Sequence, residues 1–212
     1  MHQYRVAAVG KTLCELYEIG DDATNIIAAC LFHDMGNIIK FKLELFPDFL
    51  EPEGFDYWLK VKKEYHQQYG DDEHEATLKI VKQLFDDELR SSSRRKNKEL
   101  RKERVIELID AIGFSNAQYN YECDDIGRKI AAYADMRVEP YGVTTLAHRL
   151  EDGHKRFKLH KPFVSNEVFF NDMAQFLEKI EQQLFKSIEI KPSDITEESM
   201  KKYIPTLKAF EL

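Results

Sequence analysis

Residues that favour tight turns are scarce in this chain, and this scarcity limits the folds open to it. Its 212 residues include only 9 glycines and 6 prolines. A β-sandwich or β-barrel needs a turn after each short strand, whereas long helices need few turns. Apolar residues also recur at helical spacing along much of the sequence, with no clear strand pattern. The sequence therefore predicts an all-α fold.

The predicted helices alternate with short breaks that contain polar residues, glycine or proline. The most apolar helix covers about residues 22–35 and includes the run IIAACLF. A helix that is apolar nearly all round is expected at the centre of a fold. The segment 36–54 holds two prolines and two glycines, so we expect an irregular, partly helical connection there. The other predicted helices cover about residues 3–19, 55–68, 73–89, 122–136, 145–159 and 165–187, with one more ending near residue 112, a polar loop after it, and a short helix after Pro192.

The length of the chain fits one domain with a helical extension. We predict a helical-bundle core over residues 1–160 and an extension over residues 161–212 that packs on it. The amphipathic helix at about residues 165–187 could also supply a surface for a homodimer.

The formal charge of −7 disfavours bulk nucleic-acid binding, because an acidic surface repels a phosphate backbone. A small phosphorylated ligand stays compatible with this charge, since a bound metal ion can reverse the local field. The segment 90–104 is strongly basic and begins with serines. We interpret it as a loop followed by a solvated helix face. The alternative is a basic lip that attracts phosphorylated ligands.

The three cysteines, Cys14, Cys30 and Cys123, lie far apart and form no CxxC pair. This pattern is typical of reduced thiols, and we expect a cytoplasmic protein. Cys14 and Cys30 lie among apolar helical positions, so core packing is predicted for both. The sequence holds no apolar run long enough to span a membrane, so no membrane partner is expected.

His33 and Asp34 end the most apolar predicted helix. Burying an ionised carboxylate costs several kcal/mol unless it is paired or bound to a metal. A hydrogen-bonded or capping His-Asp pair is one solution, and a metal site is the other. Two further residues favour the metal: Asp135 closes the apolar helix IAAYAD and meets the same burial problem, and His2 opens the first helix.

Together these positions offer two imidazoles and two carboxylates. This mixed nitrogen and oxygen set suits Mn²⁺, Fe²⁺, Co²⁺, Ni²⁺, Mg²⁺ or Zn²⁺ in an open site with room for water. A structural zinc site is disfavoured because no cysteine ligand is implied. We therefore predict a divalent metal ion as the cofactor.

The order H…HD…D on a helical chain resembles the HD superfamily of metal-dependent phosphohydrolases. The likeness is closest in the runs LFHDMGN and YADMRVEPYGV, and in LAHRLEDGHKRF after them; it covers about residues 1–160. It implies that His2, His33, Asp34 and Asp135 bind the metal. It also implies hydrolysis of a phosphomonoester or phosphodiester, usually in a nucleotide, by metal-activated water that Asp34 would orient.

Two departures from this family pattern matter. Many relatives read HDIGK, with a lysine for the substrate phosphate where this chain has Asn37. Lys40, one helical turn further on, could take its place if the helix continues. His2 stands at the start of the chain, where helix ends fray, so we expect a loosely held ligand.

Two more residues are candidates for catalysis and for substrate binding. His74 opens a predicted helix, whose N-terminus favours anions. Some relatives use histidines in this region for a second metal or for the substrate phosphate. Arg137 follows Asp135 by two residues and could clamp a phosphate through its planar fork, or pair with a surface carboxylate.

The sequence thus favours a phosphohydrolase that acts on a small phosphorylated substrate, with Asp34, His74 and Arg137 as catalytic residues and Lys40, His74 and Arg137 as substrate-binding residues. The alternative is a catalytically weak or inactive HD domain that serves as a ligand-binding or regulatory module. Asn37 and the terminal position of His2 favour this alternative. Retention of all four ligand types favours the enzyme.

Overall fold

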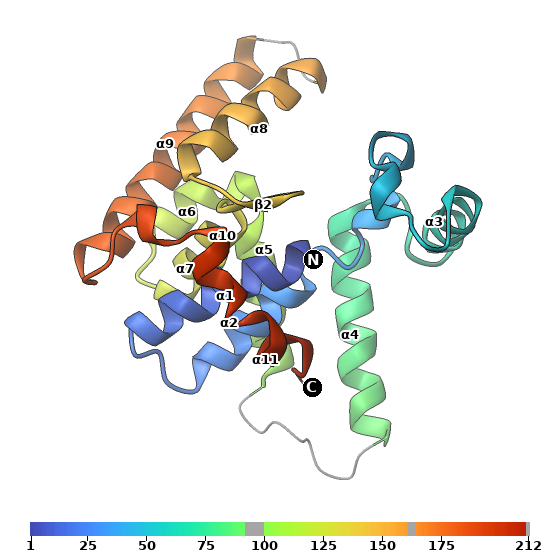
Figure 1. The fold of residues 1–212 in the computed structure, drawn as a ribbon, viewed down its shortest axis with the longest axis horizontal. Coiled ribbons are helices and arrows are strands. Elements are labelled where there is room, and N and C mark those ends of the chain that lie inside the picture. The colour runs from blue at the N-terminus through green and yellow to red at the C-terminus, as the bar shows by residue number, and fades with distance from the viewer. Residues whose placement is uncertain (92–99, 161–163, 211–212) are drawn as a thin grey trace. The chain divides into compact units, whose positions relative to one another are not determined.

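A computed structural model of the chain describes residues 1–91, 100–160 and 164–210. Within these ranges it has eleven α-helices and one sheet of two short strands (Figure 1). The predicted all-α class is therefore confirmed. None of the described helices is long and apolar enough to cross a bilayer. Of the basic segment 90–104, residues 92–99 lie outside the described residues, so neither the solvated loop nor the alternative basic lip is tested there.

The chain divides into two compact units. The core unit comprises Met1–Leu31 and Lys96–Leu212, and the inserted unit comprises Phe32–Arg95. The predicted boundary near residue 160 separates a C-terminal extension from the core, whereas the observed division separates an inserted segment. The predicted boundary therefore stays a prediction.

The core unit carries most of the helices, and every long helix predicted for it is present. Its helices and strands are α1 (His2–Leu16), α2 (Asp22–Phe32, the last residue of which begins the inserted unit), α5 (Lys102–Ile112), α6 (Ala117–Glu122), α7 (Ile126–Asp135), β1 (Val138–Glu139), β2 (Gly142–Val143), α8 (Leu146–His160), α9 (Val164–Lys186), α10 (Glu197–Lys201) and α11 (Ile204–Lys208), with 3-10 turns η4 (Phe114–Asn116) and η5 (Pro192–Asp194).

Small side chains let the central helices approach closely. A Cβ added at Gly10 of α1 would lie 3.0 Å from Cys30 Sγ and 3.9 Å from the Cβ of Ala134 in α7. Cys14 and Cys30 are buried, which confirms their predicted packing in the core. Burial raises the pKa of the Cys14 thiol to about 12, so this thiol stays protonated and apolar in character.

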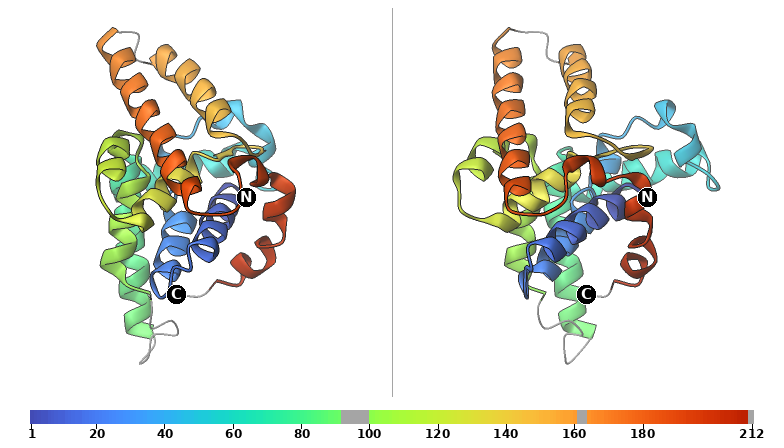
Figure 2. Two further views of the ribbon diagram at one scale, coloured as in Figure 1. Left: turned by 90° about the vertical axis from the view of Figure 1, so that its left-hand side faces the viewer. Right: turned by 60° about the vertical axis from the view of Figure 1, so that its left-hand side comes forward.

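The C-terminal helices pack on this core. Tyr133 Oη donates a hydrogen bond of 2.6 Å to Glu181 in α9, and Lys129 Nζ donates one of 2.8 Å to Gln183. Both views in Figure 2 show α8 and α9 side by side, and ring contacts such as that of Phe157 with Phe170 join them. A homodimer surface on α9 stays a prediction.

Several short elements were not predicted, among them α6, β1 and β2. The polar loop expected after residue 112 contains α6, because tertiary contacts bury Asn120, whose amide donates to the Ala111 carbonyl at 2.7 Å. The turn expected at Pro140 and Gly142 is present, and the residues beside it pair as β1 and β2. Two residues per strand are too few for an alternating pattern to be visible in the sequence.

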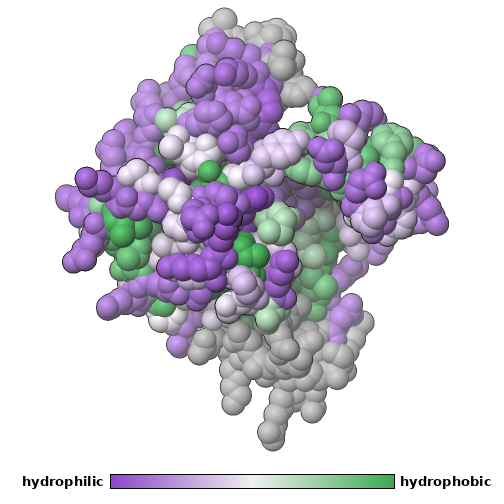
Figure 3. All heavy atoms as spheres, in the orientation of Figure 1, coloured by the Kyte–Doolittle hydropathy of each residue, from purple (hydrophilic) through white to green (hydrophobic). Residues whose placement is uncertain are grey.

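The inserted unit begins with the predicted irregular connection, which contains three 3-10 turns. Its elements are η1 (Asn37–Ile39), η2 (Leu43–Leu45), η3 (Pro47–Phe49), α3 (Phe55–Tyr69) and α4 (Glu73–Ser91). Phe49 stacks on Phe41 and Phe46. Leu45 and Tyr57 are exposed, and Figure 3 shows hydrophobic surface on this part of the chain.

Candidate metal centre

In the core unit, His2 lies beside Asp135. Their side chains approach to 3.2 Å between Nε2 and Oδ1, although 133 positions separate them in the sequence. His2 is the first residue of α1 and Asp135 is the last residue of α7, as predicted. Only 22% of the His2 side chain and 17% of the Asp135 side chain are exposed. The packing of α1 on α7 therefore unites two of the four predicted ligands.

The first turn of α1 is tied to the C-terminal part of the chain. Arg5 Nε donates to both carboxylate oxygens of Glu197 at 2.9 Å. The Arg5 backbone N–H donates to the Met1 carbonyl at 3.2 Å. Glu197 also accepts a hydrogen bond from the Val143 backbone N–H at 3.0 Å. We expected the helix end at His2 to fray. The contacts of Arg5 and Glu197 instead restrain this turn, and the sequence did not reveal them.

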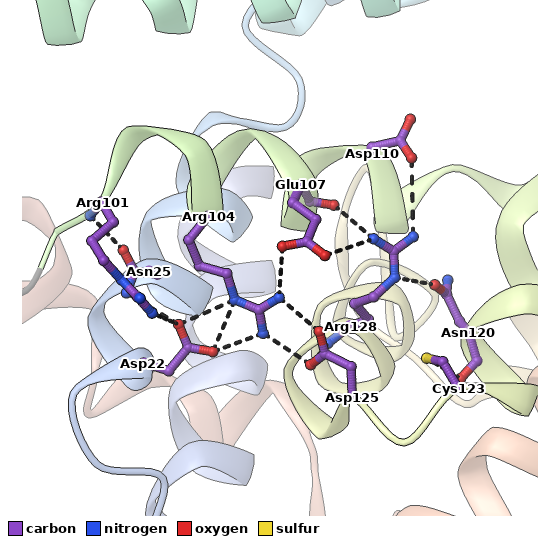
Figure 4. Close-up of polar contacts among 10 residues, drawn as sticks. All are labelled: Asp22, Asn25, Arg101, Arg104, Glu107, Asp110, Asn120, Cys123, Asp125 and Arg128. Carbon is purple, nitrogen blue, oxygen red and sulfur yellow. Dashed lines mark hydrogen bonds and ion pairs between the residues drawn. The ribbon is translucent and has the colours of Figure 1, made fainter.

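Arg104 of α5 joins the N-terminal ends of α2 and α7 (Figure 4). It donates to Asp22 at 2.8 Å and to Asp125 at 2.6 Å through separate guanidinium nitrogens. The hydrogen bond from Arg104 is the main reason that the pKa of Asp125 is lowered. Asp125 is also the N-cap of α7, where its side chain accepts from the Arg128 backbone N–H. The start of the helix that ends at Asp135 is thereby held in place.

In the inserted unit, His33 and Asp34 stand in a turn directly after α2. The helix ends at Phe32, earlier than predicted, so the HD pair does not lie within it. His33 Nε2 lies 3.6 Å from Asp34 Oδ2. Asn37 Nδ2 donates to the same carboxylate oxygen at 3.3 Å. The residue that replaces the lysine of many relatives therefore contacts the predicted ligand Asp34.

Gly36 lets this turn pack against α4. Its backbone N–H donates to Thr77 Oγ1 at 2.8 Å. A Cβ at position 36 would lie 2.3 Å from the Glu73 carbonyl oxygen and 2.7 Å from the Thr77 backbone nitrogen. Both atoms belong to the backbone and cannot rotate away, so only glycine fits. The glycine of LFHDMGN thus has a packing reason.

Lys40 and His74 also belong to the inserted unit. Lys40 does not follow on a continuous helix, because it caps η1 instead. Its Nζ lies 2.7 Å from Glu73 Oε1, and 57% of its side chain is exposed. Burial alone would raise the pKa of Glu73, but the hydrogen bonds from Lys40 and from its own backbone N–H lower it overall. His74 lies in the first turn of α4, as the sequence predicted, and its side chain is half-buried.

Arg137 has a different environment from the one that a phosphate clamp requires. Its side chain is 1% exposed. Nε donates to the Thr144 carbonyl at 2.6 Å, and one terminal nitrogen donates to the Tyr133 hydroxyl. The other terminal nitrogen donates to the carbonyls of Pro192 at 3.1 Å and Ile195 at 2.9 Å. The planar fork therefore binds the protein's own backbone, which corrects the predicted clamp.

The family model of the HD domain matches residues 1–135 of this chain. The chain belongs to the HD-domain family. Members of this family are generally metal-dependent hydrolases and typically bind divalent metal ions. The matched range contains all four predicted ligands and ends on Asp135. No curated protein and no solved structure matches the chain.

Sequence reasoning did not find Arg5, Glu197 or the contact of Asn37 with Asp34. Asn37 was visible as a departure from the family motif, and its position three residues after Asp34 is a signal for such a contact. Arg5 and Glu197 lie 192 positions apart, and no local pattern relates them.

Proposed function

We propose that this protein is a metal-dependent phosphohydrolase whose divalent ion is bound by His2, His33, Asp34 and Asp135. The observation that carries the proposal is the 3.2 Å contact between His2 and Asp135, since distant parts of the chain bring together two predicted ligands. Membership of the HD-domain family supports it. The proposed substrate is a small phosphorylated molecule, with a nucleotide phosphomonoester or phosphodiester as the first class to test.

The donor chemistry fits such an ion. His2, His33 and Asp34 each offer a nitrogen or oxygen ligand atom, and Asp135 adds a second carboxylate. This set accepts Mn²⁺, Fe²⁺, Co²⁺, Ni²⁺, Mg²⁺ or Zn²⁺. A bound ion of this kind lowers the pKa of water toward neutrality and offsets charge on phosphoryl oxygens.

The residues around the ligands have separable proposed tasks. Asn37 donates to Asp34 and would fix the orientation of its carboxylate, as partners of metal ligands do. Lys40 is exposed in its ion pair with Glu73, which weakens that pair and lets the ammonium turn to a substrate phosphate. His74 lies in the first turn of α4, where an anion is favoured.

The direct test compares Asp34→Ala with Asp48→Ala. Asp48 is exposed on η3 and serves as the matched control. Purified proteins would be loaded with Mn²⁺, Co²⁺ or Ni²⁺ and assayed for metal content and for hydrolysis of an aryl phosphate and a nucleotide panel. We expect Asp34→Ala to lose activity by more than about 100-fold, above the loss typical of an outer-shell partner. Unchanged metal content and activity in Asp34→Ala would end the proposal.

The second candidate function is a metal-binding regulatory or ligand-binding module without turnover. The substitution of asparagine for the family lysine at position 37 and the pairing of Lys40 with Glu73 favour it. The same panel separates the two functions. If the wild-type protein binds metal through Asp34 and hydrolyses no ester, the module becomes the better description.

A further inference from the structure

The segment Pro192–Glu197, here called the strap, runs from η5 to the first residue of α10. It begins 57 residues after the end of the family match at residue 135, so the family pattern does not account for it. Figure 2 shows the C-terminal segment beside the N-terminal end of α1 in both views. Two arginines hold the strap, and each stands close in sequence to a proposed metal ligand.

Arg137 holds the first end of the strap. Its guanidinium donates to the carbonyls of Pro192 and Ile195, and its side chain is almost wholly buried. Asp135 lies two residues before Arg137, at the end of α7. The hydrogen bonds from the Arg137 side chain to the backbone of the strap therefore restrain the chain just after Asp135, at the end of α7.

Arg5 holds the other end of the strap. It contacts both oxygens of Glu197, and this bidentate geometry fixes direction as well as distance. Arg5 lies three residues after His2, so their side chains share one face of α1. The contact of Glu197 with the Val143 backbone N–H also connects the strap to the β1–β2 hairpin, which follows Asp135 in the chain.

The strap itself is well braced. Thr196 and Ser199 form a capping box at the start of α10, with a Thr196 Oγ1 to Ser199 N–H contact of 3.1 Å. The Lys191 backbone N–H donates to Asp194 at 2.8 Å, and Ile195 is buried. These local bonds make the strap a rigid spacer between Arg5 and Arg137.

We propose that the strap is a positioning element for the metal centre: through Arg5 and Arg137 it sets the distance between His2 and Asp135. This inference rests on the proposed function, because it assigns those two residues to the metal. Arg137 and Glu197 are positioning residues in this scheme, since Arg137 binds the carbonyls of Pro192 and Ile195 and Glu197 binds Arg5, and neither is one of the proposed ligands. The C-terminal part of the chain thereby takes part in a site whose ligands lie within residues 2–135.

The test compares Glu197→Gln with Glu198→Gln in the full chain. The first change keeps the size of the side chain but removes its charge opposite Arg5. Glu198 is 83% exposed and pairs only with Lys201 among the contacts described, so it is the matched control. We expect Glu197→Gln to weaken Mn²⁺ affinity about tenfold, which is the effect of losing an outer partner of a metal ligand, and Glu198→Gln to leave it unchanged.

A double-mutant cycle distinguishes positioning from general destabilisation. In a His2→Ala background, Glu197→Gln should cause no further loss of Mn²⁺ affinity, because its effect acts through His2. An equal loss in both backgrounds would overturn the inference.

Hydrogen exchange of the metal-free protein provides a readout that does not depend on the proposed function. The Arg5 amide, bonded to the Met1 carbonyl, should exchange faster in Glu197→Gln than in the wild type or in Glu198→Gln. If the Arg5 amide of Glu197→Gln exchanged at the wild-type rate and the variant bound Mn²⁺ with wild-type affinity, the proposed positioning role of the strap would be wrong. Failure of the wild-type protein to bind Mn²⁺ would instead count against the proposed function, while the exchange rates still decide whether the strap holds the turn of His2.

Discussion

The two halves of the proposed metal centre are built in opposite ways. The His33–Asp34 half is mainly local: one turn after α2 supplies both ligands, and Asn37, three residues after Asp34, contacts that carboxylate, although the bond from Gly36 to Thr77 of α4 spans 41 positions. The His2–Asp135 half is long-range, because it joins residues 133 positions apart. Its supports also span the sequence: Arg104 contacts Asp125 21 positions away and Asp22 82 positions away, and Glu197 of the strap lies 192 positions from Arg5.

This difference explains which contacts of the site a short sequence motif can encode. The local half is encoded in the run LFHDMGN, where the partners of Asp34 within the turn lie one to three residues away. The long-range half depends on the packing of α1 on α7, on the bridge from Arg104 of α5 to α2 and α7, and on the C-terminal strap. A change in the motif should therefore damage the local half directly, whereas the long-range half should respond to substitutions far from either ligand.

The largest effect is expected for Gly36→Ala, which tests the local half. The new Cβ would lie 2.3 Å from the Glu73 carbonyl oxygen, so the turn must move away from α4. We expect the free energy of unfolding to fall by about 3 kcal/mol, the upper part of the range for overpacking. Denaturant unfolding measures this change.

Gly20→Ala is the control for this substitution. A Cβ at Gly20 meets no atom within 4 Å. Its expected effect on stability is below about 0.5 kcal/mol, as for ordinary surface changes. Equal stability of the two variants would show that the turn does not need glycine.

A smaller effect is expected for Arg104→Met, which tests the long-range half. The change leaves Asp22 and Asp125 without their shared partner at the starts of α2 and α7. We expect a loss of about 2 kcal/mol in the free energy of unfolding, the range for hydrogen bonds to charged groups.

Arg101→Met is the matched control for Arg104→Met. Arg101 also reaches Asp22, but at 3.4 Å and with 62% of its side chain exposed. Its loss should cost less than about 0.5 kcal/mol. If both arginine variants lost the same free energy of unfolding, the contacts of Arg104 would not be what stabilises the starts of α2 and α7.

The smallest effect concerns pH. The pKa of Asp125 is lowered from its usual value of 3.8, chiefly by the hydrogen bond from Arg104. The folded state therefore binds a proton at Asp125 less readily than the unfolded state does. The resulting stability is fully present above about pH 4 and is lost as the pH falls through the lowered pKa.

Asp125→Asn isolates this contribution. The variant should be less stable than the wild type by about 0.5 kcal/mol at neutral pH, as for a part-exposed ion pair, and the gap should narrow below pH 4. Denaturant unfolding at several pH values measures it. A gap that stayed constant down to pH 2 would mean that the charge of Asp125 contributes nothing.

The sequence by itself determined the local features of this protein. Helical periodicity and scarce turn residues predicted the all-α class and the positions of the long helices, because both depend on neighbours within a few residues. The order of His2, His33–Asp34 and Asp135, together with the runs LFHDMGN and YADMRVEPYGV, also indicated the family. Burial of Cys14 and Cys30 followed from their apolar neighbours.

Only the tertiary structure decided how these parts are held. It placed His2 against Asp135, turned Arg137 inward to the carbonyls of Pro192 and Ile195, and joined Arg5 to Glu197. An arginine after a helix has the same local pattern whether it faces a substrate or a distant backbone carbonyl. Which partner it meets depends on how separate helices pack, and a single sequence carries no periodic signal for contacts across that distance.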